Sequence, residues 1–381
     1  MTSDTALEQG QNPRGEVLSS VHTPELDGFR ALAVTMVFVA HVCYGSRLPL
    51  AVLSWMPEPL RQVITHGWLG VDLFFILSGL LITGILVDSK NSAAYFRNFY
   101  GRRALRILPL YLTCIAVMSI AYRGYGSYFV LSLGFLANFD HLFHVPEPHG
   151  PGVFWSLSIE EHFYLLWPLL VYFLNRSHLL LLSILIVGVT PILRGVCAAY
   201  GMDANSEIYM YSFFRFDGLA LGAALAIWVR SRYFTSKHIV ILVTTLGGLA
   251  LAITVIGRPY GIMQGQSVAS AALRYTQAEF LFAAAIASAL ALGGSTLTAP
   301  LRSRVAKFVS DRSYCIYLIH LALIDLYLWT MHSLNINDIV SLGPVLTVCL
   351  RLIILGVTTL LIASLSRRFL EGPFLQLKRY F

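Results

Sequence analysis

Apolar stretches long enough to cross a lipid bilayer follow one another along almost the whole of this 381-residue chain. A helix needs about 20 residues to cross roughly 30 Å of hydrocarbon. Ten windows meet that length, at 27–45, 67–88, 104–122, 155–174, 178–200, 208–229, 238–257, 268–294, 312–332 and 343–365. With 56% hydrophobic and only 12% charged residues, the chain is too apolar for a soluble domain. The sequence therefore predicts an all-α, polytopic integral membrane protein embedded in a lipid bilayer.

The positive charges predict how these spans are oriented. An eleventh apolar stretch, 126–139, is short, and we interpret it as re-entrant or interfacial. If it does not cross and the N-terminus is cytoplasmic, eighteen Lys and Arg residues fall in cytoplasmic segments and four fall outside, as the positive-inside rule requires. We therefore expect both termini to be cytoplasmic. The net charge of +7 then reflects topology and not nucleic-acid binding.

The chain carries no internal repeat, Gly/Ser linker or low-complexity tract. We therefore predict one transmembrane domain, residues 24–381, preceded by a disordered cytoplasmic tail, residues 1–23. The five cysteines are scattered without a CxxC pair, so neither a disulfide framework nor a zinc site is expected. His141, His144 and His149 in the outer loop resemble metal-ligand spacing only loosely, and we predict no metal.

Ionisable residues inside the predicted spans are the candidates for chemistry, because each costs roughly 2.5–3.5 kcal/mol at a helix centre on insertion scales. Arg30 and His41 are eleven residues apart in the first span, which is three helical turns plus about 20°, so they share a face. Arg30 is expected near the cytoplasmic end and His41 toward the outside. His41 is then either a hydrogen-bonded packing residue or a reactive imidazole.

The second span places Asp72 in its outer third, at the level expected for His41. A carboxylate there would orient and stabilise an imidazole that acts as a general base. The competing interpretation is that Asp72 only caps the start of its helix. Gly79 and the other glycines of this span are compatible with close helix packing.

A basic cluster, Arg102, Arg103 and Arg106, lies at the predicted cytoplasmic mouth of the third span. Guanidinium groups match phosphate bidentately, so this cluster suits a phosphorylated ligand. Ordinary positive-inside anchoring is the alternative.

The span that starts near residue 155 carries Ser156, Glu160, Glu161 and His162 in its first two turns. Ser156 and Glu160 are four residues apart and share a face, and acidic residues suit a helix N-terminus. Capping explains one carboxylate, but hardly two beside a histidine.

Polar residues also lie deep in two later spans. Arg215 and Asp217 are predicted mid-span, where they either pair with other buried charges or bind substrate. Ser313, Tyr317 and His320 recur at i, i+4 and i+7 on one helical stripe. That stripe suits either a substrate site or an interhelical hydrogen-bond network.

Five sequence patterns occur in order along the chain. They are Leu-Asp-Gly-x-Arg with a His eleven residues later (26–41), Gly-Val-Asp-x-Phe-Phe-x-x-Ser-Gly (70–79), Arg-x-x-Arg-x-x-Pro-x-Tyr (103–111), Trp-Ser-Leu-x-x-Glu-x-x-Phe-Tyr (155–164) and Ser-Tyr-x-x-Tyr-Leu-x-His (313–320). Together they resemble the membrane acyltransferase-3 family, whose members O-acylate bacterial surface glycans, peptidoglycan and some antibiotics. The likeness extends from Leu26 to Pro373. One departure is His162, where relatives often carry Gln.

The resemblance implies an O-acyltransferase of the bacterial cytoplasmic (inner) membrane. Acyl-coenzyme A, commonly acetyl-CoA, would enter from the cytoplasm, and a carbohydrate or glycosylated acceptor from outside. His41, oriented by Asp72 or Glu160, would act as general base or carry the acyl group covalently. The implied donor-binding residues are Arg30, Arg103, Arg106 and Tyr111, and the implied acceptor-binding residues are Ser156, Glu161, Arg215, Asp217, Tyr317 and His320.

Two other classes of protein compete with this hypothesis. Buried His, Asp, Glu and Arg also build proton relays, so a proton-coupled transporter or exporter of a saccharide or small solute is the first alternative, although no inverted repeat supports it. A non-catalytic membrane sensor that retains the fold is the second. The acceptor, the acyl chain length and the oligomeric state are left open by the sequence.

Overall fold

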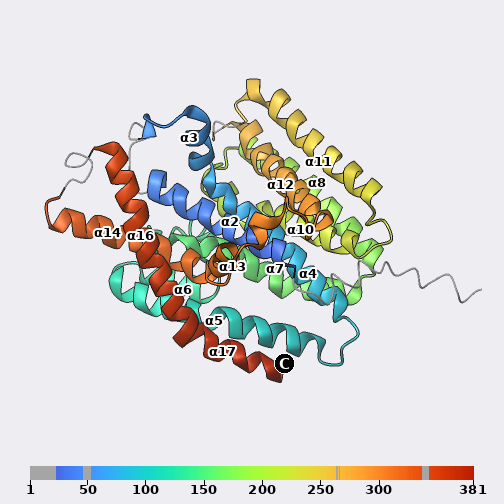
Figure 1. Ribbon diagram of the computed structural model, residues 1–381, viewed down its shortest axis with the longest axis horizontal. Helices are drawn as coiled ribbons and strands as arrows, with labels where there is room; N and C mark the ends of the chain where they lie inside the picture. The colour runs from blue at the N-terminus through green and yellow to red at the C-terminus, as the bar shows by residue number, and fades with distance from the viewer. Residues whose placement is uncertain (1–22, 46–52, 263–264, 266, 337–342) are drawn as a thin grey trace, which may run out of the picture. The chain divides into compact units, whose positions relative to one another are not determined.

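The computed structural model describes residues 23–45, 53–262, 265, 267–336 and 343–381 (Figure 1). Of the predicted disordered tail, residues 1–22 lie outside the described residues. Within the described ranges every regular element is an α-, 3₁₀- or π-helix. This confirms the all-α prediction.

Nine of the ten predicted apolar windows coincide with helix. The window 208–229 is instead divided among three helices, Glu207–Met210, Ser212–Phe214 and Phe216–Val229, so Arg215 and Asp217 lie at the start of the last helix and not in the middle of a span. The elements are α2 (Pro24–Ala40) continued by a π-helical turn η1 (His41–Gly45), η3 (Gly67–Leu69) with α4 (Gly70–Asp88), α5 (Tyr95–Ala121), α7 (Phe154–Phe173), α8 (Arg176–Ala199), α9 (Glu207–Met210), α10 (Phe216–Val229), α11 (Ser236–Gly257), α12 (Val268–Ala291), α14 (Ser313–Ser333) and α16 (Pro344–Ser366). Short helices connect them: α3 (Glu58–Thr65), α6 (Gly126–Leu133), η4 (Ala137–Phe139), η5 (Gly150–Val153), η6 (Ser212–Phe214), η7 (Arg258–Tyr260), η8 (Ala299–Arg302), α13 (Arg304–Ser310), η9 (Arg367–Glu371), α17 (Gly372–Gln376) and η10 (Leu377–Tyr380).

Seven helices in the described part of the chain are long and apolar enough to cross a membrane. They span Pro24–Cys43, Gly67–Asp88, Tyr95–Ala121, Arg176–Ala199, Ser236–Tyr260, Ser313–Ser333 and Pro344–Tyr380. The protein is therefore a polytopic membrane protein. Two statements stay predictions: α7, α10 and α12 also cross the membrane, and both termini are cytoplasmic.

The short apolar stretch at 126–139 is broken into α6 and η4. The eight residues of α6 rise roughly 12 Å, far less than the ~30 Å of a hydrocarbon core. Phe135, in the break between the two helices, has a left-handed φ of 55°. The Tyr111 hydroxyl on α5 donates to the Ser132 carbonyl at 2.8 Å, and its ring stacks on Phe135 with centroids 4.7 Å apart. Tyr111 therefore anchors this segment to α5.

The chain divides into two compact units whose segments alternate in sequence. The described residues of unit 1 belong to 1–29, 72–95 and 163–303, and those of unit 2 belong to 30–71, 96–162 and 304–381.

Unit 1 contains four helices that pack against one another, α8, α10, α11 and α12 (Figure 1). Glycines bring α4 and α10 into close contact. A Cβ atom on Gly79 would lie 1.9 Å from the Leu219 carbonyl oxygen, and one on Gly222 would lie 2.0 Å from the Ile76 carbonyl oxygen. Any larger residue would force the helices apart, so Gly79 does serve the close packing that its span predicted.

Unit 2 is organised around α14, which packs against η5 and α16. Gly150 makes the approach of η5 possible. A Cβ atom there would lie 2.0 Å from the Tyr122 hydroxyl oxygen and 3.0 Å from the Ala322 Cα. The loop before α7 is thereby held directly against α14.

Candidate functional site

A pair of histidines joins the first and the penultimate candidate spans within unit 2. The α-helix of α2 changes to the π-helical turn η1 at His41, and such turns occur frequently at functional sites. The Nδ1 atom of His41 lies 2.9 Å from the Val37 carbonyl oxygen and 3.1 Å from Nε2 of His320. The His320 side chain is buried, whereas His41 is partly accessible.

The hydrogen-bond partners assign a tautomer to each ring. A carbonyl oxygen can only accept, so Nδ1 of His41 must carry the hydrogen that it donates to Val37. Nδ1 of His320 lies 2.7 Å from the Tyr317 carbonyl oxygen and carries a hydrogen for the same reason. His320 Nε2 is then an acceptor facing the Nδ1–H of His41. This arrangement leaves the lone pair of His41 on Nε2.

Two further predicted residues extend this polar chain. The Ser156 hydroxyl donates to the Val153 carbonyl at 3.1 Å and lies 2.6 Å from the Tyr317 hydroxyl. Since the single hydrogen of Ser156 is used, the Tyr317 hydroxyl donates to Ser156. The structure thus brings together His41, His320, Tyr317 and Ser156, which come from η1, α14 and α7.

A second polar cluster is sealed inside unit 1. Nη2 of Arg215 donates to Oδ1 of Asp72 at 2.6 Å, and both side chains have 0% exposure. Nη1 of Arg194 lies 2.8 Å from Oδ2 of Asp217, again at 0% exposure. The guanidinium of Arg215 also lies 4.0 Å from the ring centroid of Tyr275. Arg215 and Asp217 are therefore each paired with another buried charge, which is one of the two alternatives that the sequence left open.

Glu279 belongs to the same cluster and is fully buried. Neither of its carboxylate oxygens has a hydrogen-bond partner in the part of the chain that the structure describes. It interacts electrostatically with Asp72, Asp217, Arg194 and Arg215. Three buried carboxylates thus face two buried guanidinium groups.

The predicted donor-binding residues lie on α2 and α5. Arg103 and Arg106 are partly buried, one helical turn apart on α5, whereas Arg102 is exposed. The Arg103 guanidinium lies 5.9 Å from the Phe99 ring centroid. Arg30 is partly buried on α2. Tyr111 is instead engaged with Ser132 and Phe135, as described above.

The two acidic residues of α7 differ in their surroundings. Glu160 and Glu161 are both partly buried, and Oε1 of Glu161 is buried without a hydrogen-bond partner among the described residues. The roles of Asp72 and Glu160 in orienting His41 stay predictions.

Within the described ranges no three His, Cys, Asp or Glu side chains come together as a metal site.

Three charged residues were not singled out from the sequence: Arg194, Glu279 and Asp325. Arg194 donates to the Phe214 carbonyl at 2.8 Å and to the Thr276 hydroxyl at 2.6 Å, in addition to its ion pair. Each of the three is a charged residue within a predicted apolar window. Arg215 and Asp217 were selected because a charge inside a membrane span needs a partner or a function. The same rule would also have selected these three residues.

The chain belongs to the acyltransferase-3 family, because the sequence model of this acyltransferase domain matches residues 23–367. It is similar to the peptidoglycan O-acetyltransferase OatA of Listeria monocytogenes, at 28% identity over 93% of this chain and 56% of that protein. It is also similar to the putative peptidoglycan O-acetyltransferase YrhL of Bacillus subtilis, at 28% identity over 92% of this chain and 55% of the relative. The O-acetyltransferase OatA of Staphylococcus aureus is 27% identical over 96% and 58% of the two chains.

The chain therefore spans a little over half the length of these curated relatives. No solved structure matches it. The family resemblance inferred from five short patterns is confirmed.

Proposed function

We propose that this protein is a membrane O-acyltransferase of the bacterial cytoplasmic membrane. It moves an acyl group, first of all acetyl, from cytoplasmic acyl-CoA to a hydroxyl of a glycan or glycosylated acceptor. Family membership and the names of the three relatives support the reaction class. The observation that carries the mechanism is the free lone pair on Nε2 of His41, which the contacts of Nδ1 leave available.

His41 acts as the general base in this proposal. Its Nε2 takes the proton of the acceptor hydroxyl, the hydroxyl oxygen attacks the thioester carbonyl, the C–S bond breaks, and the leaving thiolate receives the proton from His41. While His41 is an imidazolium, its Nδ1–H donates to His320 Nε2 and to the Val37 carbonyl. Both acceptors are in place before the reaction, so the site needs no rearrangement to stabilise the charge.

The same lone pair also suits a covalent route, in which Nε2 attacks the thioester carbonyl, the C–S bond breaks, coenzyme A leaves as the thiolate, and Nε2 carries the acyl group as an acyl-imidazolium. The acceptor hydroxyl then attacks that acyl group, the N–C bond breaks to restore His41, and the hydroxyl proton passes to the thiolate. The two routes differ in one observable: only the covalent route transfers label from acyl-CoA to the protein when acceptor is absent.

Arg103 and Arg106 suit the phosphates of acyl-CoA. Their one-turn separation and partial burial on α5 allow two guanidinium groups to face one ligand. Ser156 and Tyr317 are proposed to contact the acceptor, since their hydroxyl groups bond to each other and the Tyr317 carbonyl bonds to His320. Peptidoglycan is named for the Listeria relative and is the first acceptor to test.

The test is acyl transfer from radiolabelled acetyl-CoA supplied to the cytoplasmic face of inverted membrane vesicles. Wild type should place label in alkali-labile ester, and His41→Ala should not, at equal protein in the membrane. The matched control is His178→Ala, which removes an exposed imidazole at the start of α8 and should leave transfer intact. Near-normal transfer by His41→Ala would overturn the proposed role of His41.

A proton-coupled transporter is the alternative, and the buried Glu279 without a hydrogen-bond partner is the observation that favours it. A transporter would move an unmodified solute and consume no acyl-CoA. Solute flux that is lost in Glu279→Gln, together with absent ester label in wild type, would replace the acyltransferase proposal.

A further inference from the structure

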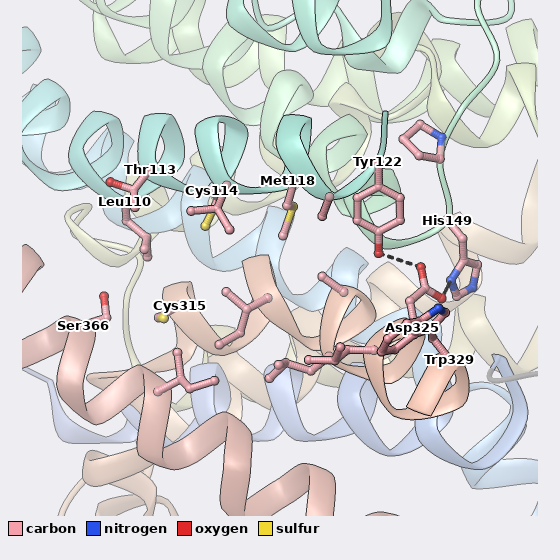
Figure 2. A pocket seen from close by; sticks show the side chains of 18 of the residues that line it. Leu110, Thr113, Cys114, Met118, Tyr122, His149, Cys315, Asp325, Trp329 and Ser366 are labelled. Carbon is pink, nitrogen blue, oxygen red and sulfur yellow. Dashed lines mark hydrogen bonds and ion pairs between the residues drawn. The ribbon is translucent and has the colours of Figure 1, made fainter. Parts of the chain in front are cut away.

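A long groove runs through unit 2 on a face of α14 (Figure 2). It is about 980 Å³ in volume, near the upper end of the roughly 300–1,000 Å³ typical of small-molecule sites. Its walls come from α5, α14 and the end of α16, all of them candidate membrane spans. Most of the lining is apolar, for example Leu110, Val117, Met118, Leu323 and Ile362.

The groove has about the length of one lipid leaflet. Its lining begins at Leu110 on α5 and reaches Tyr122, directly after the end of that helix. These two residues are about twelve positions apart, which corresponds to a rise of roughly 18 Å. Half of a hydrocarbon core is roughly 15 Å. Figure 2 shows Leu110 and Ser366 toward one end and Tyr122 and Asp325 toward the other. A single extended hydrocarbon chain fits this distance.

The other end of the groove is polar and well ordered by hydrogen bonds. The Asp325 carboxylate accepts from the Tyr122 hydroxyl at 2.8 Å and lies 2.6 Å from Nδ1 of His149 (Figure 2). Gly150 allows this arrangement, because any side chain there would strike Tyr122. The carboxylate is 20% exposed and the imidazole 40% exposed, so both remain accessible to a ligand.

An aromatic side chain completes this end. Trp329 follows Asp325 by one helical turn, lines the same groove and is 66% exposed. Trp residues favour the level where hydrocarbon meets water. The polar end therefore has the character of a membrane interface, and the apolar length behind it has the character of the bilayer interior.

These features select an amphiphile with an uncharged, hydroxyl-rich head. A carboxylate at the head position accepts hydrogen bonds from hydroxyl groups and repels a phosphate. We propose that the groove binds the hydrocarbon chain of a neutral glycolipid, whose sugar hydroxyls bind Asp325 and His149 and whose ring covers Trp329. Resting on the proposed acyltransferase function, this glycolipid is the acceptor, because His149 at the polar end of the groove interacts electrostatically with His41 and His320.

The experiment uses the full-length protein in nanodiscs and a long-chain alkyl glucoside that carries a diazirine in its chain. A matched probe is the same alkyl chain as the free alcohol. The glucoside should label peptides from 110–122 and 315–329 saturably, and unlabelled alkyl glucoside should compete while phosphatidylglycerol should not. Asp325→Asn should raise the glucoside concentration that gives half-saturation about tenfold, which is the order expected for losing hydrogen bonds to a charged group.

A pair of matched valine variants tests the apolar part. Val117 lines the groove and is 61% exposed, whereas Val357 on α16 is 54% exposed and is not part of the lining. Val117→Trp fills the groove without disturbing a packed core and should abolish saturable labelling. Val357→Trp should label like wild type.

Several outcomes would overturn the proposal. The free-alcohol probe could reach half-saturation at the same concentration as the glucoside, or phosphatidylglycerol could compete with the glucoside. Either result would show that the groove binds any membrane lipid. Absence of labelling in the two peptides would remove the site altogether. Binding is read without turnover and should persist in His41→Ala. Saturable labelling without ester transfer would therefore contradict the enzyme proposal alone, and transfer without labelling would contradict the glycolipid site alone.

Discussion

The hydrogen bond between the two histidines yields a quantitative prediction. Replacing His320 by Leu fills the same buried position with an apolar side chain but removes the acceptor that lies 3.1 Å from Nδ1 of His41. Neutral His41 still donates to the Val37 carbonyl, so the resting state loses little. In the imidazolium the lost hydrogen bond is charge-assisted.

The magnitude follows from the difference between the two states. Hydrogen bonds to charged groups contribute about 1.5–3 kcal/mol and neutral ones about 0.5–1.5 kcal/mol. The difference, about 1–1.5 kcal/mol, corresponds to about a tenfold change in rate. We therefore expect His320→Leu to lower kcat about tenfold and to leave KM for acyl-CoA and acceptor nearly unchanged. His320→Gln should recover most of kcat, because its side-chain carbonyl can accept the same hydrogen.

Steady-state transfer rates at saturating acyl-CoA measure this effect, with membrane content of each variant matched by quantitative immunoblotting. The sequence alone placed His320 among the acceptor-binding residues, and that role would raise KM for the acceptor while sparing kcat. A KM effect of that kind, or a Gln variant no better than Leu, would refute the positioning role.

Three further predictions concern stability. Asp72→Ala should cost about 3–5 kcal/mol, because it strands the Arg215 guanidinium at 0% exposure; thermal unfolding in detergent checks this, and a loss below about 1 kcal/mol would contradict it. Glu279→Gln should retain the unfolding temperature, because Gln keeps the volume and removes a carboxylate in excess over the buried guanidiniums; a marked fall would show that this charge is paired. Burial, and after it the carboxylate of Asp140, raise the pKa of Glu147 to about 8 from 4.5. The folded state therefore favours the protonated acid of Glu147. Its contribution to the free energy of unfolding is fully present below pH 4.5 and is lost as the pH rises toward 8. Glu147→Gln should flatten that decline in a thermal-unfolding series, and an unchanged slope would exclude Glu147 as its source.

The helices could be predicted because their signal is local. Each apolar window is set by about twenty consecutive residues and needs no knowledge of distant contacts. The close approach at Gly79 was also foreseeable, since small residues are what helix contacts in membranes require. The break after α6 depends instead on the left-handed Phe135. Hydropathy indicates that this stretch is short, but not where it turns.

The pairing of the site residues could not be predicted from spacing. Asp72 and Arg215 are separated by 143 residues, and His41 and His320 by 279. The sequence identified all four as buried polar groups, but a helical period relates residues only along one helix. Partner choice across helices depends on how the helices pack. For that reason the spacing of the residues did not predict that Asp72 binds Arg215.

The two clusters stabilise their buried polar groups in different ways, by ion pairs in unit 1 and by neutral hydrogen bonds in unit 2. This difference affects where chemistry can occur. In unit 1 two buried guanidinium groups are each paired with a carboxylate, because a lone buried charge is costly. In unit 2 the chain from Ser156 through Tyr317 and His320 to His41 can be satisfied by neutral donors and acceptors. A carboxylate in the place of His320 would hold a buried charge throughout the resting state. A neutral imidazole accepts the same hydrogen bond without that cost, so charge needs to arise at His41 only while a proton is being moved.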